Sequence, residues 1–183
     1  AEYGDPFPGA KKWVVPVTYY VGGNPTDKDL EILNRMVETL NVIPGFPGMT
    51  PAEKEFGAAL RIYFCSPREF ENRMGGNLDT STLDGAVTVW YGDPNEIISG
   101  LICIRNDIDQ FVRNSVIQEE LYNGMGLIED THLRQESISF AGYSTPQALH
   151  PIDLLLLQLL YHPDLLPRMN AAECEAVIRQ IYG

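Results

Sequence analysis

The sequence predicts an α+β fold in which a twisted, mostly mixed β-sheet of about four strands packs on an N-terminal helix and a central helix, followed by a small helical C-terminal part. Two observations carry this prediction. Segments follow in the order strand, helix, three strands, helix, loop, helix and helix. The 183 residues are 44% hydrophobic and 21% charged, as in one globular domain. We therefore expect a single domain over residues 1–183, with the sheet and central helix in 1–126 and the helical part in 127–183.

The first two elements have contrasting patterns. Residues 13–21, WVVPVTYYV, are rich in β-branched and aromatic side chains and predict a strand, in which Pro16 indicates an edge or a bulge. Residues 26–43 then carry apolar side chains at helical spacing. Thr26 and Asp29 can cap the free N–H groups at the start of this helix.

The middle of the chain predicts three more strands, separated by turns. A short capped turn is expected at Thr50–Glu53, and a short helix begins at Ser66 and Pro67. The strands themselves are expected at residues 58–66, 85–91 and 99–107.

Three helices complete the chain. The central one is predicted at about residues 110–125, because Gly124 and Gly126 end its pattern. A loop runs from residue 127 to about 148, and the two last helices are expected within 150–162 and 170–182.

The formal charge of −12 narrows the classes of partner. Nucleic acids and anionic membrane surfaces reward clustered lysine and arginine, so neither is expected. No apolar run reaches the ~18 residues of a membrane-spanning helix. The acidic charge fits a role in solubility, cationic ligands or metal ions.

The chain opens with AEYGDPF, without Met, which predicts either that a signal or lipoprotein segment was removed or that the sequence was trimmed. Of the three cysteines, Cys65 and Cys103 each end a strand-like run. A disulfide between Cys65 and Cys103, with Cys174 left over, and three buried thiols are both compatible with this pattern.

The central helix carries the residues of greatest chemical interest. At about 100° per residue, Glu119 and Asn123 fall on one face, the apolar Ile117 and Leu121 on another, and Glu120 between them. A helix that is apolar on two faces is largely buried, and a carboxylate buried there requires a cation or several donors. Alternatively, both carboxylates are solvated or accept backbone N–H groups and act structurally.

The stretch VIQEELYNGMGLIED resembles the zinc-binding helix of metzincin-type metalloproteases, H-E-x-x-H-x-x-G-x-x-[HD]. KKWVVPVTYYV is similar to the first strand of matrix-type metzincins, and the order of elements agrees with a metzincin core. The resemblance assigns a zincin-like fold with a degenerate site. In this pattern Glu119 takes the position of the first ligand, Glu120 that of the general base and Asn123 that of the second ligand. Gly126 takes the position of the turn and Glu129 that of the third ligand.

A second resemblance covers nearly the whole chain. AEYG, EELYNGMGLIED, SISF and DLLLLQLLYHP are similar to motifs of a bacterial family of exported domains of unknown function, whose central motif is E-E-L-x-Q-x-L-G-L. This resemblance implies an extracytoplasmic protein, which is periplasmic, at the cell surface or secreted. Members of the family are often lipid-anchored, so a lipid anchor upstream of Ala1 is compatible with the resemblance.

The altered ligands change the expected chemistry. Glu119, Asn123 and Glu129 offer only oxygen, so we expect no zinc and, if any metal, calcium or another hard divalent ion. Without a metal, Glu120 can form an acid–base pair with Glu129 or Asp130.

Trp90 and Tyr91 lie in the strand expected at residues 85–91, before the central helix. In metzincins, the edge strand before the active-site helix lines the substrate cleft. The resemblance therefore makes them candidates, with Asp130, for the lining of a cleft, while packing in the core is the alternative for both aromatic residues.

Three functions are compatible with these features. The first is a pseudo-peptidase that binds a peptide, glycan or protein without cleaving it. The second is a hydrolase with Glu120 as general base and an oxygen-ligated metal or none. The third is a structural role for both carboxylates. Whether the protein is an enzyme is left open, and binding is favoured.

Overall fold

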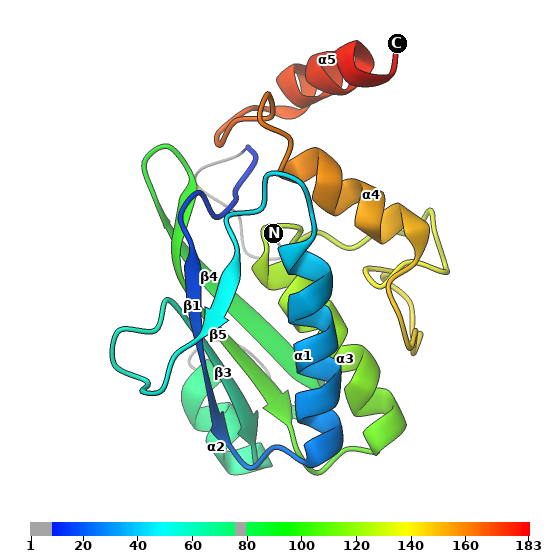
Figure 1. Ribbon diagram of the computed structural model, residues 1–183. Helices are drawn as coiled ribbons and strands as arrows, with labels where there is room; N and C mark the ends of the chain where they lie inside the picture. The colour runs from blue at the N-terminus through cyan, green and yellow to red at the C-terminus, as the bar shows by residue number, and fades with distance from the viewer. Residues whose placement is uncertain (1–8, 76–79) are drawn as a thin grey trace.

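The computed structural model describes residues 9–75 and 80–183. Within them, a mixed α/β fold is built on one five-stranded sheet with the strand order β2-β1-β3-β5-β4 (Figure 1). The first four strands in this order are parallel, and the edge strand β4 runs antiparallel to β5. The strands are β1 (Val17–Gly23), β2 (Met49–Pro51), β3 (Leu60–Cys65), β4 (Gly85–Gly92) and β5 (Glu96–Arg105).

The expectation of about four strands misses β2, the edge strand beside β1. The turn expected at Thr50–Glu53 overlaps this strand, whose residues Met49–Pro51 pair in parallel with Val17–Tyr19. A three-residue strand that ends in proline has too short a pattern to be recognised from sequence. The first strand also begins later than expected, at Val17 rather than at residue 13.

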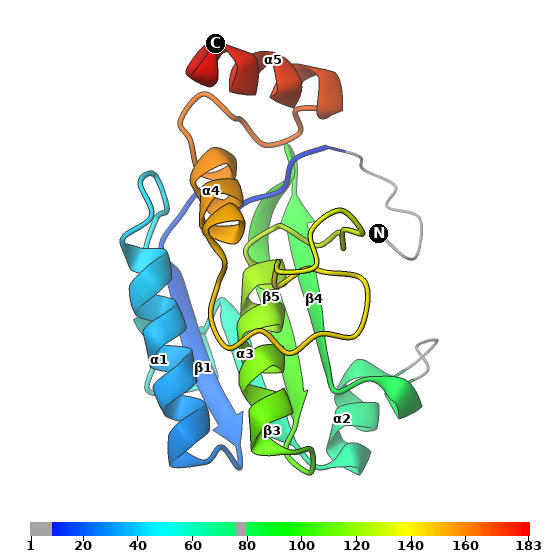
Figure 2. The same ribbon diagram turned by 90° about the vertical axis from the view of Figure 1, so that its right-hand side faces the viewer.

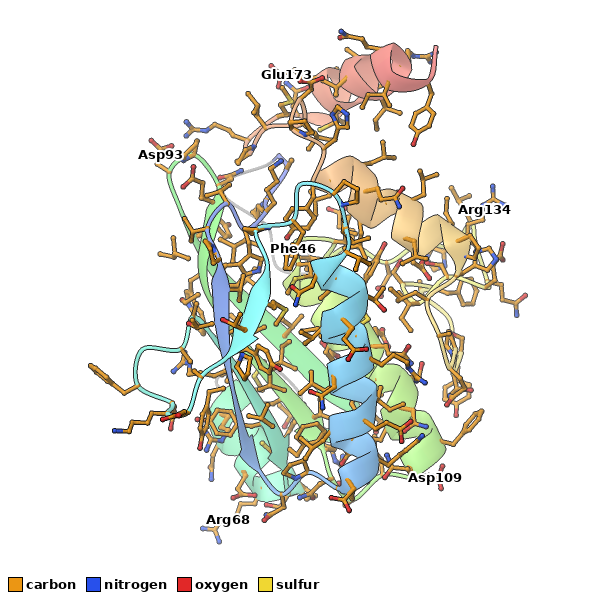
Figure 3. All side chains as sticks on the ribbon, viewed as in Figure 1. Phe46, Arg68, Asp93, Asp109, Arg134 and Glu173 are labelled. Carbon is orange, nitrogen blue, oxygen red and sulfur yellow. The ribbon has the colours of Figure 1, made fainter. Side chains whose placement is uncertain are left out.

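The helices follow the predicted order. They are α1 (Asp27–Asn41), α2 (Pro67–Met74), α3 (Gln110–Gly124), α4 (Pro151–Leu160) and α5 (Ala171–Tyr182), with a 3₁₀ turn η1 (Thr80–Thr82) before β4. The expected capping box of Thr26 and Asp29 is present at α1. Asp109, labelled in Figure 3, caps α3 by accepting from the backbone N–H of Phe111 at 2.8 Å.

The sheet divides the molecule into two unequal layers. Helices α1 and α3 lie side by side on one face (Figures 1 and 2), where they form the main core with β1, β3 and β5. On the other face, α2 covers one end of the sheet over a smaller cluster. The buried members of this smaller cluster are Tyr63, Cys65, Phe70, Met74 and Cys103.

A buried ion pair fixes α3 against α1. Nε of Arg113 donates to Oδ1 of Asp29 at 2.8 Å, and Nε2 of Gln110 donates to the same oxygen at 2.7 Å. The remaining Arg113 donors reach the backbone carbonyls of Asn106 and Ile108 and the side chain of Gln110. Because every partner is hydrogen-bonded, this polar network sets the position of α3 beneath the sheet.

The segment between α3 and α4 is held by a second buried carboxylate. Asp153, in the first turn of α4, accepts hydrogen bonds from the Ser137 hydroxyl and from the backbone N–H groups of Ile138 and His150. The same segment is bonded to α3 through Gln147, which accepts from Nδ2 of Asn114 and donates to the carbonyl of Phe111, so it passes close to that helix (Figure 2).

The far end of α4 is anchored by the N-terminal segment. Nζ of the buried Lys12 donates to the carbonyl of Leu160, the last residue of α4, and to the carbonyls of His162 and Leu165, which follow the helix. Phe46 (Figure 3) meets Tyr161 edge to face, with ring centroids 4.9 Å apart. Within the described ranges, none of the helices is both long and apolar enough to cross a membrane.

Candidate functional site

The candidate site lies where β4 crosses α3. At Gly85, the first residue of β4, an added Cβ would lie 2.8 Å from Oε1 of Glu120. Gly124, at the end of α3, similarly lies against Ile102 and Val87 of the sheet. The two glycines allow the helix to approach the strand closely, so the Glu120 carboxyl is placed directly beneath the strand.

A cavity of about 240 Å³ opens beside these groups. The residues that line it come from α3, from the first residue of β4 and the three residues before it, and from residues 140–144. Figure 2 shows where α3 and β4 run in the fold. Its lining residues are Thr82, Leu83, Asp84, Gly85, Val112, Ser115, Val116, Glu119, Glu120, Phe140, Gly142, Tyr143 and Ser144.

Glu119 and Glu120 are desolvated carboxyl groups. Burial, reinforced by the charge of Asp130, raises the pKa of Glu119 to about 7. Glu120 is 9% exposed, and burial, followed by the charges of Glu119 and Asp130, raises the pKa of Glu120 well above its ordinary value. Within residues 9–75 and 80–183, neither side chain has a hydrogen bond or ion pair. An unpaired buried carboxyl is costly, so its presence here marks a candidate functional site.

Two further polar atoms near this pair are buried without a partner in the described part of the chain. They are Oγ of Ser115, whose residue is 2% exposed and lines the cavity, and Oδ1 of Asn123, one turn further along α3. Buried polar groups are nearly always hydrogen-bonded, so these orphaned atoms are expected to meet a ligand or water.

The residues predicted from the zinc-protease pattern are brought together only in part. Glu119 and Glu120 share the cavity, whereas Asn123 is buried beside it and is not one of its lining residues. Glu129 and Asp130 are exposed in the segment after α3 and lie outside the lining, although Asp130 is close enough to act electrostatically on both carboxyls.

The donors of the cavity do not fit a catalytic zinc ion. Such ions are held by histidine or cysteine with at most one carboxylate, and neither histidine nor cysteine is among the described residues that line the cavity. Among the described residues, no group of three or more histidine, cysteine, aspartate or glutamate side chains is placed to hold any metal ion. The set Glu119, Asn123 and Glu129 for a hard divalent ion therefore stays a prediction.

The aromatic residues predicted for the cleft lie elsewhere on β4. Trp90 is 43% exposed, and its ring faces the guanidinium of Arg61 at 6.0 Å. Since Gly85 faces α3 and side chains alternate along a strand, Trp90 points to the opposite face of the sheet. Tyr91 follows a register shift and packs under Nζ of Lys11 at 4.9 Å. Neither is a lining residue of the cavity.

Cys65 and Cys103 lie on adjacent parallel strands and are both buried as free thiols. They share a hydrogen bond, which is the main cause lowering the pKa of Cys65. The strand register places Cys103 opposite Tyr63, two residues before Cys65, and the disulfide between the cysteines stays a prediction.

Of the residues that line the cavity, the sequence analysis proposed only Glu119 and Glu120 as site residues. Ser115 precedes Glu119 by four residues on the same helical face, so the helical period could have identified it. Gly85, Phe140 and Tyr143 come from segments distant in sequence, and no local pattern connects them with α3.

The fold and the site together define an α/β domain with two neighbouring carboxyls between an edge strand and a central helix. Glu120 is buried and Glu119 is half-buried, and neither has a hydrogen bond or ion pair among the described residues. A family model described as "Protein of unknown function (DUF2927)" matches residues 1–180, so the chain belongs to this family. The expected membership of a family of unknown function is thereby confirmed. Comparison with curated proteins found no match.

Proposed function

We propose that the protein is a zincin-like pseudo-peptidase, a domain that binds a ligand in the cavity over α3 without cleaving it. The main support is that Glu119 and Glu120 line one cavity. By resemblance to zinc proteases, Glu119 takes the position of a metal ligand and Glu120 that of the general base. The order of elements and the approach of β4 to α3 support the zincin-like frame. The oxygen donors of the cavity favour binding over zinc chemistry.

A cleavage assay tests this function. The purified chain is incubated with unfolded casein in the presence of zinc, calcium or manganese, and fragments are measured by mass spectrometry. We expect none from the wild type or from Glu120→Gln. Metal-dependent cleavage that disappears in Glu120→Gln would overturn the proposal.

The ligand-binding half of the proposal needs its own experiment. Peptides selected from a random library on the wild-type chain are expected to lose binding to the double variant Glu119→Gln/Glu120→Gln. Glu38→Gln, which removes one exposed carboxylate from α1, is the matched control and should retain binding. Equal binding by all three chains would place the interaction outside the cavity.

One observation favours a second function, a hydrolase with Glu120 as general acid or base. Burial raises the pKa of Glu120, and a raised pKa is common among carboxyls that act as general acids or bases. The cleavage assay above, extended to glycan substrates, separates the two functions, because only the hydrolase loses turnover in Glu120→Gln.

We further propose an extracytoplasmic site of action, on the basis of the resemblance to exported domains. Expression of the full gene in its own cells, followed by separation of cytoplasm from envelope and medium, tests this. Recovery in the cytoplasm alone would contradict it.

A further inference from the structure

We infer that the cavity over α3 binds an organic cation, namely an ammonium or guanidinium group at the end of a short aliphatic chain. This inference rests on the proposed binding function and names the chemistry of the ligand. Lysine or arginine side chains of a peptide and free aliphatic amines share this chemistry.

The first argument is charge. Asp84, Glu119 and Glu120 line the cavity, and the lining includes no lysine or arginine among the residues that the structure describes. Arg105, which acts electrostatically on Asp84, is engaged by Asp107 through two hydrogen bonds of 2.9 and 2.7 Å. Among the described residues, Glu119 and Glu120 therefore have no counter-ion in the lining, and a bound cation would offset their desolvation.

The second argument is the unpaired hydroxyl of Ser115. Its Oγ atom is buried and has no partner in residues 9–75 and 80–183, while the residue lines the same cavity as the carboxyls. Ammonium and guanidinium groups carry several N–H donors and no acceptor. Such a group can donate to the Ser115 hydroxyl and to a carboxylate at the same time, which satisfies both.

The third argument is the aromatic wall. Phe140 and Tyr143 line the cavity opposite α3, and the Tyr143 side chain is 86% exposed. The Phe140 ring packs closely over Gly142, where an added Cβ would lie 2.5 Å from Cε1 of the ring. Aromatic faces attract cations, and an exposed ring beside a cavity can cover the aliphatic part of a ligand.

Size and ligand number favour an organic cation over a metal ion. The volume of about 240 Å³ is far larger than an ion requires. It is also smaller than the ~300–1,000 Å³ of sites for drug-sized ligands, so it fits one side chain or a small amine. Among the described residues, no group of three or more acidic, histidine or cysteine side chains is placed to hold a metal ion, which also favours an organic cation.

The test is titration of the purified chain with n-butylamine and n-butylguanidine, with n-butanol as the neutral control. Chemical shifts of the Gly85 and Ser115 amides report binding at the cavity. Glu120→Gln should weaken binding about tenfold or more, since a hydrogen bond to a charged group is worth about 1.5–3 kcal/mol. Glu38→Gln, with the same net charge as Glu120→Gln, should leave binding within about twofold of the wild type.

A second arm distinguishes the sources of the cation. A peptide with a central lysine that binds more tightly than n-butylamine, and more tightly than its norleucine analogue, identifies a polypeptide ligand. Equal binding of amine and lysine peptide identifies a free amine. Both results support the inference.

Three results would overturn it. One is equal response to n-butanol and n-butylamine, and another is the absence of shifts at Gly85 and Ser115. The third is stoichiometric binding of calcium or manganese that is lost in Glu119→Ala, with no response to the amines. In the first two cases the cleavage and peptide-selection assays decide separately whether the proposed function stands.

Discussion

Gly85 and Glu120 are in direct contact across the interface of β4 and α3, because the space that a Cβ on Gly85 would occupy is filled by the side chains of Glu120 and Val116. We expect Gly85→Ala to lower the free energy of unfolding by about 1–3 kcal/mol through overpacking. It should also displace the Glu120 carboxyl and weaken ligand binding. Urea denaturation measures the first effect and amine titration the second.

The matched control is Gly92→Ala at the other end of β4, where an added Cβ meets only Cγ2 of Ile98 at 3.9 Å. This variant should be as stable as the wild type or slightly more stable, because alanine restricts the unfolded chain. Equal losses of stability in the two variants would show that glycine is needed for the strand itself and not for the approach to Glu120.

The desolvated carboxyls of Glu119 and Glu120 predict that the free energy of unfolding falls as the pH rises. The folded-state pKa of Glu119 is raised from 4.5 to about 7, and that of Glu120 is raised further in the same direction. Between pH 4.5 and 7 the folded chain thus binds more protons than the unfolded chain, and the free energy of unfolding decreases with pH. Below pH 4.5 both states are protonated, and the penalty vanishes.

Glu119→Gln and Glu120→Gln should each reduce this pH dependence and stabilise the protein at pH 7 by about 1–3 kcal/mol. Thermal melts at several pH values measure it. Glu38→Gln should leave the slope unchanged. Destabilisation by both glutamine variants at pH 7 would instead support the structural role, in which the carboxylates hold the neighbouring chain.

Much of the fold could be predicted because its signals are local. The cap of α1 lies within Thr26–Asp29, and α3 ends beside the glycines of its own sequence. The short strand β2 has no such signal, since it depends on pairing with β1. Of the cavity, only Glu119 and Glu120 were predicted, because both lie on the single helix α3. Gly85 and Tyr143 approach Glu120 through tertiary packing, which no spacing in the sequence records.

The buried ion pair of Asp29 and Arg113 predicts a strong dependence of stability on one carboxylate. Asp29→Asn leaves the Arg113 guanidinium buried without a counter-ion and should cost about 3–5 kcal/mol. Glu31→Gln, which breaks the exposed pair with Lys28, should leave stability unchanged within error. Urea denaturation of the two variants compares them, and similar losses would contradict the central role of the buried pair.

The same carboxylate should contribute to acid unfolding. Burial alone would raise the pKa of Asp29, but hydrogen bonds from Thr26, Gln110 and Arg113 outweigh it and lower the pKa. The stabilisation is therefore present above the ordinary value of 3.8 and is lost as the pH falls below it. Asp29→Asn should be less sensitive to acid between pH 4 and 2 than the wild type, as measured by circular dichroism.

Lys12 predicts a loss of stability that depends on hydrogen bonds rather than on charge. Its ammonium group donates to three carbonyls at the end of α4. Lys12→Met would remove this donor from all three, while the carbonyl of His162 would keep its hydrogen bond from the backbone N–H of Leu165. We expect a loss of about 2–4 kcal/mol, because an unsatisfied buried acceptor costs about 1–3 kcal/mol. Lys28→Met, at an exposed position, is the control. Hydrogen exchange of the last turn of α4 should accelerate only in Lys12→Met.

The contact of Cys65 with Cys103 predicts a disulfide in an oxidising medium. In a Cys174→Ser background, oxidised glutathione should take up the two electrons and two protons of the pair, giving one intramolecular disulfide and two molecules of reduced glutathione. The thiolate of Cys65 attacks first, since the hydrogen bond from Cys103 lowers the pKa of Cys65. Alkylation followed by mass spectrometry should then find no free thiol.

In the Cys103→Ser control, the reaction should stop at a mixed disulfide with glutathione. Two thiols that still alkylate after prolonged oxidation and unfolding would show that the pair stays reduced.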